Sequence, residues 1–159
     1  MPFLLTLLRH AHAEPAHVEG SDFDRLLSRD GRAAARAAAA RIGALPTPPD
    51  RVIASPARRT RETAEILREC ARPGLVVEYL PELYLAPLET LRAIVAAGWR
   101  TGHLAIVGHN PGLSELVADL AGEKASAGLA PADAFTFGFD STRRGDPPQS
   151  VVRHRDGMR

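Results

Sequence analysis

Short apolar runs alternate along the chain with longer stretches in which apolar residues recur at helical spacing. The short runs predict strands at Phe3–Leu8, Arg51–Ala54, Leu75–Glu78 and His103–Val107, and two further strands at Ala134–Asp140 and Ser150–His154. The longer stretches predict helices at Gly31–Leu45, Arg58–Ala71, Leu88–Ala97 and Leu113–Ala121. This alternation indicates an α/β fold.

The strands predicted at Phe3–Leu8 and His103–Val107 are apolar almost throughout, not only at every second position. Strands of this kind are buried on both faces, as in a parallel sheet with helices on each side. The pattern therefore predicts a three-layer sandwich with a mostly parallel central sheet. A chain of 159 residues, 45% of them hydrophobic, is long enough for one such domain, which we place at residues 1–159.

Charge and cysteine content exclude several classes of function. The formal net charge of +1 provides no broad field for nucleic acid or an anionic membrane, and no segment approaches the ~20 apolar residues of a membrane span. Cys70 is the only cysteine, which excludes an internal disulfide and a cysteine-based zinc site. The apolar run Phe3–Leu8 is shorter than the roughly 7–15 residues of a secretory signal core. We expect a cytoplasmic monomer.

Three polar segments follow directly after predicted strands. They are Arg9-His10 after the first strand, Ser55-Pro56 after the second and His109-Asn110-Pro111 after the fourth. In parallel α/β sheets the carboxyl ends of the strands form the ligand crevice. The sequence therefore predicts that these segments meet at one site.

The helix after Ser55-Pro56 carries an arginine on an unexpected face. Ser55 is suited to be its N-cap and Pro56 its first residue. At about 100° per residue, Arg58 lies on the charged arc of the helix, whereas Arg59 shares an arc with Thr63, Ile66, Leu67 and Cys70. An arginine there needs an anion to neutralise it. Two partners are open: an internal carboxylate, or a bound phosphate held by the guanidinium group.

The segment around His109 has the pattern of a strand, a tight turn and a helix. Asn110 can cap the helix, Pro111 can occupy its first position, and the free N–H groups there form an anion site close to His109. A single histidine in such a turn is often structural. Two histidines and two arginines at strand ends favour a phosphate pocket.

These segments resemble the motifs of the histidine phosphatase superfamily, also called the phosphoglycerate mutase-like family, and within it the small SixA-type phosphohistidine phosphatases. The matching pieces are Leu8-Arg9-His10-Ala11, Ala54-Ser55-Pro56-Ala57-Arg58-Arg59-Thr60-Arg61-Glu62-Thr63-Ala64, Leu80-Pro81-Glu82-Leu83 and Val107-Gly108-His109-Asn110-Pro111-Gly112. The third residue of the usual Arg-His-Gly motif is alanine here, Ala11. The resemblance implies a phosphoglycerate mutase-like fold and assigns the family's catalytic arginine to Arg59, not Arg58.

The resemblance also implies a mechanism without metal or cofactor. His10 attacks phosphorus through one ring nitrogen, and the other nitrogen donates its proton to a backbone carbonyl, which fixes the tautomer. Arg9, Arg59 and His109 surround the phosphoryl oxygens and stabilise the charge that develops on them, with Asn110 also binding substrate. Water then releases phosphate from His10.

Glu82 has two possible roles. In the wider family the glutamate of a Leu-x-Glu motif protonates the leaving group, and Leu80-Pro81-Glu82 matches that motif; a surface glutamate is an equally good interpretation. The choice bears on the substrate, because an alkoxide needs a strong acid to leave, whereas imidazole has a pKa of about 6.5 and needs little help.

The spacing of the motifs leaves no room for a large cap insertion, which predicts an open cleft. We therefore expect a phosphatase acting on phosphohistidine of a phosphotransfer protein, with a phosphatase of small phosphorylated metabolites and a non-catalytic phosphate-binding module as alternatives.

The other histidines do not indicate a metal site, because His12, His17 and His103 show no convincing metal-ligand spacing. Asp22 and Asp24 are expected in a polar loop over the site, available for contact with substrate and not as catalysts. His154 is expected to be solvated.

Overall fold

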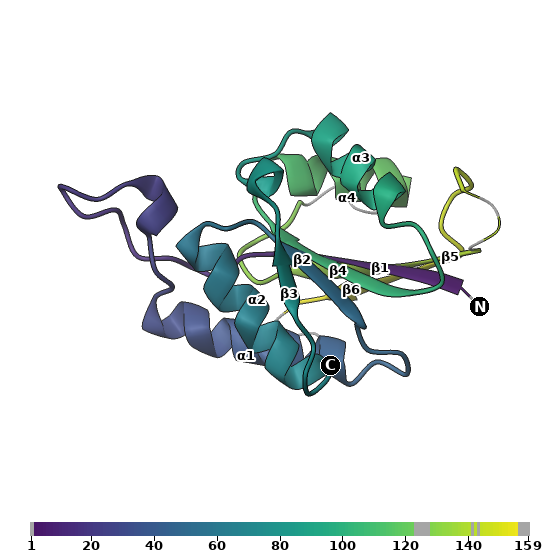
Figure 1. The fold of residues 1–159 in the computed structure, drawn as a ribbon, viewed down its shortest axis with the longest axis horizontal. Coiled ribbons are helices and arrows are strands. Elements are labelled where there is room, and N and C mark those ends of the chain that lie inside the picture. The colour runs from purple at the N-terminus through teal and green to yellow at the C-terminus, as the bar shows by residue number, and fades with distance from the viewer. Residues whose placement is uncertain (1, 123–127, 141, 143, 156–159) are drawn as a thin grey trace.

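The computed structural model describes residues 2–122, 128–140, 142 and 144–155. Its centre is a six-stranded sheet in the order β3-β2-β4-β1-β5-β6 (Figure 1). The strands are β1 (Pro2–Arg9), β2 (Arg51–Ala54), β3 (Val77–Tyr79), β4 (Gly102–Gly108), β5 (Ala134–Asp140) and β6 (Ser150–His154). The α-helices are α1 (Arg29–Gly43), α2 (Arg58–Ala71), α3 (Leu88–Ala97) and α4 (Gly112–Ala121), and two short 3-10 helices are η1 (Asp22–Asp24) and η2 (Pro81–Leu83).

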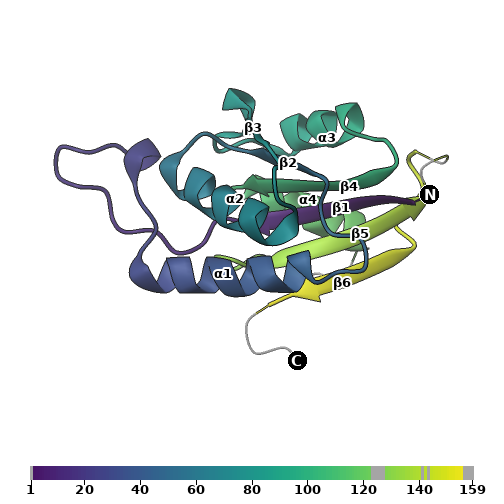
Figure 2. The same ribbon diagram turned by 60° about the horizontal axis from the view of Figure 1, so that its bottom comes forward.

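The sheet is parallel from β3 through β2 and β4 to β1, and β5 and β6 extend it with antiparallel pairings. Helices α1 and α2 cover one face, and α3 and α4 cover the other, as Figures 1 and 2 show from two directions. The predicted three-layer, mostly parallel architecture is confirmed.

Strand β1 contributes to both apolar layers of the core. Successive side chains of a strand point to opposite faces, so Phe3, Leu5 and Leu7 pack in the layer under α3 and α4. Leu8 lies in the other layer, with Val52 and the buried alanines of α1. The nearly continuous hydrophobicity of this strand therefore has the predicted cause.

Several element boundaries differ from the sequence prediction by one or two residues, and one predicted helix cap is not found. Strand β3 begins at Val77, because the register with β2 pairs Val52 with Val77 and Ala54 with Tyr79, while Leu75 is still in a turn closed by its N–H on the carbonyl of Arg72. Helix α2 begins at Arg58 with Ala57 as its N-cap residue, and no side chain caps it. The predictions that Ser55 caps this helix and that Pro56 is its first residue are both wrong, because Pro56 and Ala57 precede the helix.

No helix in the described part of the chain is long and apolar enough to cross a lipid bilayer.

Candidate active site

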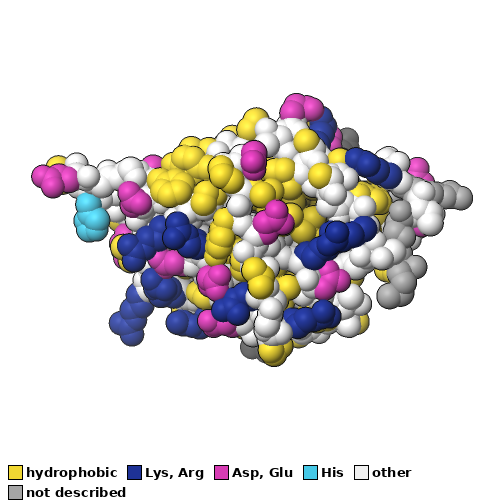
Figure 3. Space-filling view, viewed as in Figure 1, with side chains coloured by type: hydrophobic (Ala, Val, Ile, Leu, Met, Phe, Trp, Pro, Cys, Tyr) yellow, Lys and Arg dark blue, Asp and Glu magenta, His cyan; other side chains and the backbone are white. Residues whose placement is uncertain are grey.

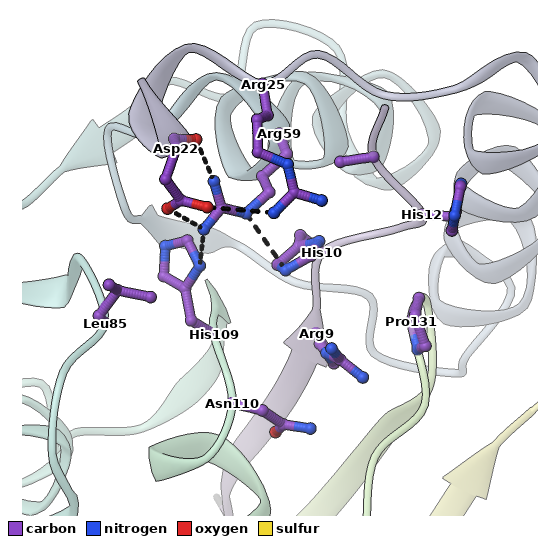
Figure 4. Close-up of a pocket in the computed structure, with 11 residues that line it drawn as sticks. Arg9, His10, His12, Asp22, Arg25, Arg59, Leu85, His109, Asn110 and Pro131 are labelled. Atoms are coloured by element: carbon purple, nitrogen blue, oxygen red, sulfur yellow. Dashed lines mark hydrogen bonds and ion pairs between the residues drawn. The ribbon is translucent and has the colours of Figure 1, made fainter. Parts of the chain in front are cut away.

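The carboxyl ends of three parallel strands meet at one edge of the sheet. Arg9 at the end of β1 is paired with Gly108 at the end of β4, and Ala54 of β2 is paired with Val107. His10, Ser55 and His109, which follow these strands, are thereby brought together. His10 and His109 adjoin a cavity of about 300 Å³ (Figure 4). Its lining residues are Arg9, His10, His12, Ala13, Asp22, Arg25, Arg59, Leu85, His109, Asn110 and Pro131.

His10 is held in one tautomer at the wall of this cavity. Its Nδ1 lies 2.8 Å from the carbonyl oxygen of Ala11, and since a carbonyl only accepts hydrogen bonds, Nδ1 carries the proton. Nε2 then keeps a lone pair and accepts from Nε of Arg59 at 3.3 Å. Burial, assisted by the neighbouring Arg59 and Arg9, lowers the pKa of His10 to about 4. The ring is therefore neutral at pH 7, as a nucleophile requires.

Arg59 is the arginine of α2 that enters the site. Its side chain is only 3% exposed, whereas Arg58 is exposed and bonds to Glu62. Arg59 lines the cavity and Arg58 does not. The guanidinium also donates from NH1 to the backbone carbonyl of Asp22 at 2.7 Å and from NH2 to the Asp22 carboxylate at 3.0 Å. The internal carboxylate that the sequence left open as a partner is Asp22.

His109 lies between Arg59 and Ser55. NH2 of Arg59 can only donate, so Nδ1 of His109 accepts from it at 3.2 Å. Nε2 therefore carries the proton and donates to Oγ of Ser55 at 2.7 Å. Burial, followed by the positive charge of Arg59, lowers the pKa of His109 to about 3. The hydroxyl of Ser55 thus orients this histidine, a role that the sequence analysis missed.

Arg9 and Asn110 line the cavity and donate hydrogen bonds to the same backbone carbonyl. NH1 of Arg9 and Nδ2 of Asn110 both donate to the carbonyl oxygen of Leu129, at 3.0 and 2.8 Å. Oδ1 of Asn110 accepts from the N–H of Ser114, in the first turn of α4, at 3.2 Å. The N-cap position is nevertheless Pro111, so Asn110 lies one residue before the position predicted for it. Pro111 precedes the first helical residue, Gly112, instead of being that residue. Burial lowers the pKa of the Arg9 guanidinium, although an arginine side chain stays cationic in proteins.

The structure does not bring Glu82 to the cavity. Glu82 is exposed on η2 and is not among the cavity-lining residues. The short 3-10 turn buries the next residue, Leu83, in the core. Tyr84 is the side chain of this segment that reaches the site: its hydroxyl donates to Asp22 at 2.6 Å, and its ring packs edge-on against His109. Of the two interpretations of Glu82, its position favours a surface glutamate.

The remaining histidines lie elsewhere or have structural partners. His12 lines the cavity and bonds to Ser28 through Nδ1 at 2.8 Å. His17 is exposed, and His103 is buried in the sheet. The expectation that His154 is solvated is wrong: it is 6% exposed, because β6 pairs with β5 and its Nε2 reaches Thr136. Among the described residues no three His, Cys, Asp or Glu side chains form a group that could hold a metal ion.

The sequence analysis gave no role in the site to Arg25 and Leu85, which line the cavity, or to Tyr84, which contacts Asp22 and His109. Asp22 and Arg25 come from the segment before α1, for which the sequence predicted a polar loop over the site. No local pattern marks Tyr84 or Leu85, because they approach the other residues only through the packing of η2 against the sheet.

Comparisons with known proteins show which proteins have a similar sequence and fold. The family model for the histidine phosphatase superfamily (branch 1) matches residues 5–101. No match is found among curated proteins. A structure from Agrobacterium tumefaciens assigned as phosphohistidine phosphatase SixA has a TM-score of 0.79 and 30% identity, covering 86% of this chain and 92% of that one.

Two further structures have similar folds. One from Nakamurella multipartitia, also assigned as SixA, has a TM-score of 0.75 and 27% identity over 96% of each chain. The protein histidine phosphatase SixA in complex with tungstate has a TM-score of 0.76 and 22% identity, covering 96% of this chain and 94% of that one. At that identity the likeness shows the fold alone.

Proposed function

The chain belongs to the histidine phosphatase superfamily, and from this premise we propose that it removes the phosphoryl group from phosphohistidine of a phosphotransfer protein, through a phosphohistidine formed on its own His10. The family and its structural relatives support a phosphatase. The intermediate, the substrate and the roles of single residues are the proposal. The observation that carries it is the neutral His10, whose Nε2 lone pair faces the cavity beside Arg59 while Nδ1 is bound to a carbonyl.

In the first step Nε2 of His10 attacks phosphorus, and the bond from phosphorus to the leaving group breaks on the opposite side. Arg9 and Arg59 supply positive charge for the oxygens of the transferring group. This charge stabilises the negative charge that these oxygens carry in the transition state. The Nδ1–H bond to Ala11 becomes stronger as the His10 ring gains positive charge. The same bond keeps the ring from turning.

In the second step water attacks phosphorus and the bond to His10 breaks. The electron pair returns to Nε2, phosphate leaves, and the water's proton goes to phosphate or to solvent. His10 regains the neutral form with its proton on Nδ1. Arg9 and Arg59 provide the positive charge, so neither step requires a metal ion.

The position of Glu82 supports phosphohistidine over phosphate esters as the substrate. Esters of ordinary alcohols release an alkoxide and need an acid at the leaving group, whereas imidazole is a good leaving group by itself. Glu82 is exposed outside the cavity, and Asp22 is the carboxyl group that the described chain brings into it. A site equipped in this way suits an imidazole leaving group.

The surface beside the cavity supports a protein substrate. Figure 3 shows basic side chains gathered over the N-terminal ends of α1 and α2, which begin with Arg29 and Arg58. Both arginines are exposed. A basic rim of this kind would attract an acidic partner surface and orient it over the cavity.

The proposal is tested first by looking for the phosphoryl adduct. We expect wild-type protein to form an acid-labile adduct during turnover that peptide mapping assigns to His10. His10→Ala should form no adduct, and its kcat should fall at least about a thousandfold, because the nucleophile is absent. His17→Ala, which changes an exposed histidine, is the matched control and should behave as wild type. Wild-type protein that binds phosphate but never forms the adduct would favour a phosphate-binding module instead.

The substrate is tested by comparing a phosphorylated phosphotransfer protein with a panel of small phosphate esters. We expect a higher kcat/KM for the protein, inhibition by vanadate and full activity in the presence of chelators. Dominant turnover of the esters would replace the proposed substrate with a small metabolite. Loss of activity with a chelator would contradict a mechanism without metal.

A further inference from the structure

The Asp22 carboxylate is held in the site by three side-chain hydrogen bonds. It accepts from the Tyr84 hydroxyl at 2.6 Å, from Arg59 at 3.0 Å and from Arg25 at 3.0 Å. The rings of Phe23, Tyr84 and His109 pack edge-on in series and tie η1 to the end of β4. The Asp22 side chain is nevertheless 44% exposed, so a molecule that enters the cavity can reach the carboxylate.

Asp22 and His10 lie at opposite ends of the Arg59 guanidinium. His10 is bonded to Nε of that group, whereas Asp22 is bonded to NH1 and NH2 (Figure 4). In phosphoryl transfer the attacking and leaving atoms are roughly in line on the two sides of phosphorus. A phosphoryl group placed against Nε2 of His10 and Arg59 therefore has its leaving group on the side of the cavity where Asp22 lies.

We infer that Asp22 is a specificity-determining residue that recognises the cationic imidazole ring of phosphohistidine and discriminates against anionic leaving groups. This inference rests on the proposed function. Phosphohistidine can carry a proton on its unphosphorylated ring nitrogen, which makes the ring a cation with an N–H that a carboxylate can accept. A carboxylate beside that N–H favours the protonated ring.

The charges of the transfer balance without a catalytic acid. Nε2 of His10 forms a bond to phosphorus, and the bond from phosphorus to the substrate nitrogen breaks with its electron pair remaining on that nitrogen. The substrate ring, which entered as a cation, leaves as neutral imidazole with its original proton next to Asp22. His10 becomes the cationic phosphorylated ring, with its own proton on Nδ1 next to the Ala11 carbonyl. The reaction exchanges one phosphoimidazolium for another.

The surroundings of Asp22 suit an acceptor and not a proton donor. The Tyr84 hydroxyl, together with Arg25 and Arg59, holds the pKa of the Asp22 carboxyl well below its usual range. When Arg59 turns to phosphoryl oxygens, Tyr84 and Arg25 still hold the carboxylate in place. Asp22 is thus not a substitute for the acid expected at Glu82.

The test compares two small substrates whose leaving groups have conjugate acids of similar strength but different charge. Phosphoimidazole releases neutral imidazole from a cationic ring, and p-nitrophenyl phosphate releases an anion. Asp22→Asn keeps the size and one acceptor oxygen but removes the charge. We expect kcat/KM for phosphoimidazole to fall about tenfold or more. We expect kcat/KM for p-nitrophenyl phosphate to rise, because the negative charge that repels the departing nitrophenolate has been removed.

Asp24→Asn is the matched control, since Asp24 is in the same 3-10 helix and, in the part of the chain that the structure describes, its side chain bonds to exposed Ser21. It should leave both rates unchanged, and thermal unfolding should show that both variants are folded. Equal losses with both substrates would overturn the inference and make Asp22 a support for Arg59. Equal gains would overturn it too and make Asp22 a competitor for the phosphate position. If wild-type protein does not turn over phosphoimidazole at all, the proposed function itself fails, whatever Asp22→Asn does.

Discussion

At the scale of single residues, hydrogen-bond partners decide the state of the two histidines in the site. His10 faces a carbonyl that can only accept, and His109 faces an arginine that can only donate. The two rings consequently hold their protons on different nitrogens. Each ring presents a lone pair to Arg59, which is compatible with two neutral histidines only 5.4 Å apart between ring centroids.

Ser55→Ala tests whether the tautomer of His109 matters. The change removes the acceptor for the buried Nε2–H, so the proton can move to Nδ1 and the ring can turn away from Arg59. We expect kcat to fall on the order of tenfold, with a second tautomer of His109 visible in nitrogen NMR shifts. Ser21→Ala, at an exposed serine, serves as the control. A variant with normal kcat and a mixed tautomer would show that the orientation of His109 is not important for turnover.

At the scale of elements, the sequence located the strands and helices well because their apolar periodicity is strong. The bounds of β2, α2, α3, β5 and β6 agree with the prediction to the residue. The short 3-10 helices η1 and η2 were not predicted, because three residues are too few to show a period. They carry Asp22 and Glu82, the two carboxylates whose roles the sequence could not decide.

The start of α4 depends on a close contact that only glycine permits. A Cβ on Gly112 would lie 2.0 Å from the backbone carbonyl oxygen of Ala86. Helix propensity by itself favours alanine over glycine by about 1 kcal/mol, but this contact is with backbone and cannot be relieved by a rotamer change. Gly112→Ala is therefore expected to destabilise the protein by about 1–3 kcal/mol. It should also lower activity, because His109 and Asn110 lie close to the start of the helix.

Urea unfolding and kcat/KM measure the two effects of Gly112→Ala. Gly20→Ala is the control, since a Cβ there would be no closer than 3.3 Å to its neighbours. A stability equal to or above that of wild type would show that the loop at Ala86 moves away at little cost.

At the scale of the whole molecule, buried neutral histidines make the fold sensitive to acid. His103 and His154 are joined through Thr6 and Thr136 in a chain of hydrogen bonds that crosses β4, β1, β5 and β6. Burial lowers the pKa of both, as it does for His10 and His109. The sheet and the active site therefore share the same requirement for uncharged imidazole.

The sign of the resulting pH dependence follows from proton counts. The unfolded chain takes up protons on these histidines as the pH falls below about 6.5, whereas folded His10 and His109 take them up only near pH 4 and 3. Within this window the unfolded state binds more protons, so the free energy of unfolding falls as the pH falls. Each histidine contributes at most about 1.4 kcal/mol per pH unit.

Urea unfolding from pH 7 to pH 4 measures this dependence. His154→Gln cannot gain the proton and should show a shallower decline than wild type, even if it is less stable at pH 7. A decline of equal slope in the variant would mean that His154 is protonated in the folded state at the pH values tested.

The sequence by itself determined the layers of the fold, the convergence of Arg9, His10 and His109 at the strand ends, and the choice of Arg59 over Arg58. These features depend on periodicity and on the position of a residue relative to its own strand or helix, which local sequence records. Only the tertiary structure decided the roles of Ser55, Asp22 and Tyr84 and the exclusion of Glu82 from the cavity. Those depend on which side chains meet across segments far apart in the chain, and such contacts leave no period in the sequence.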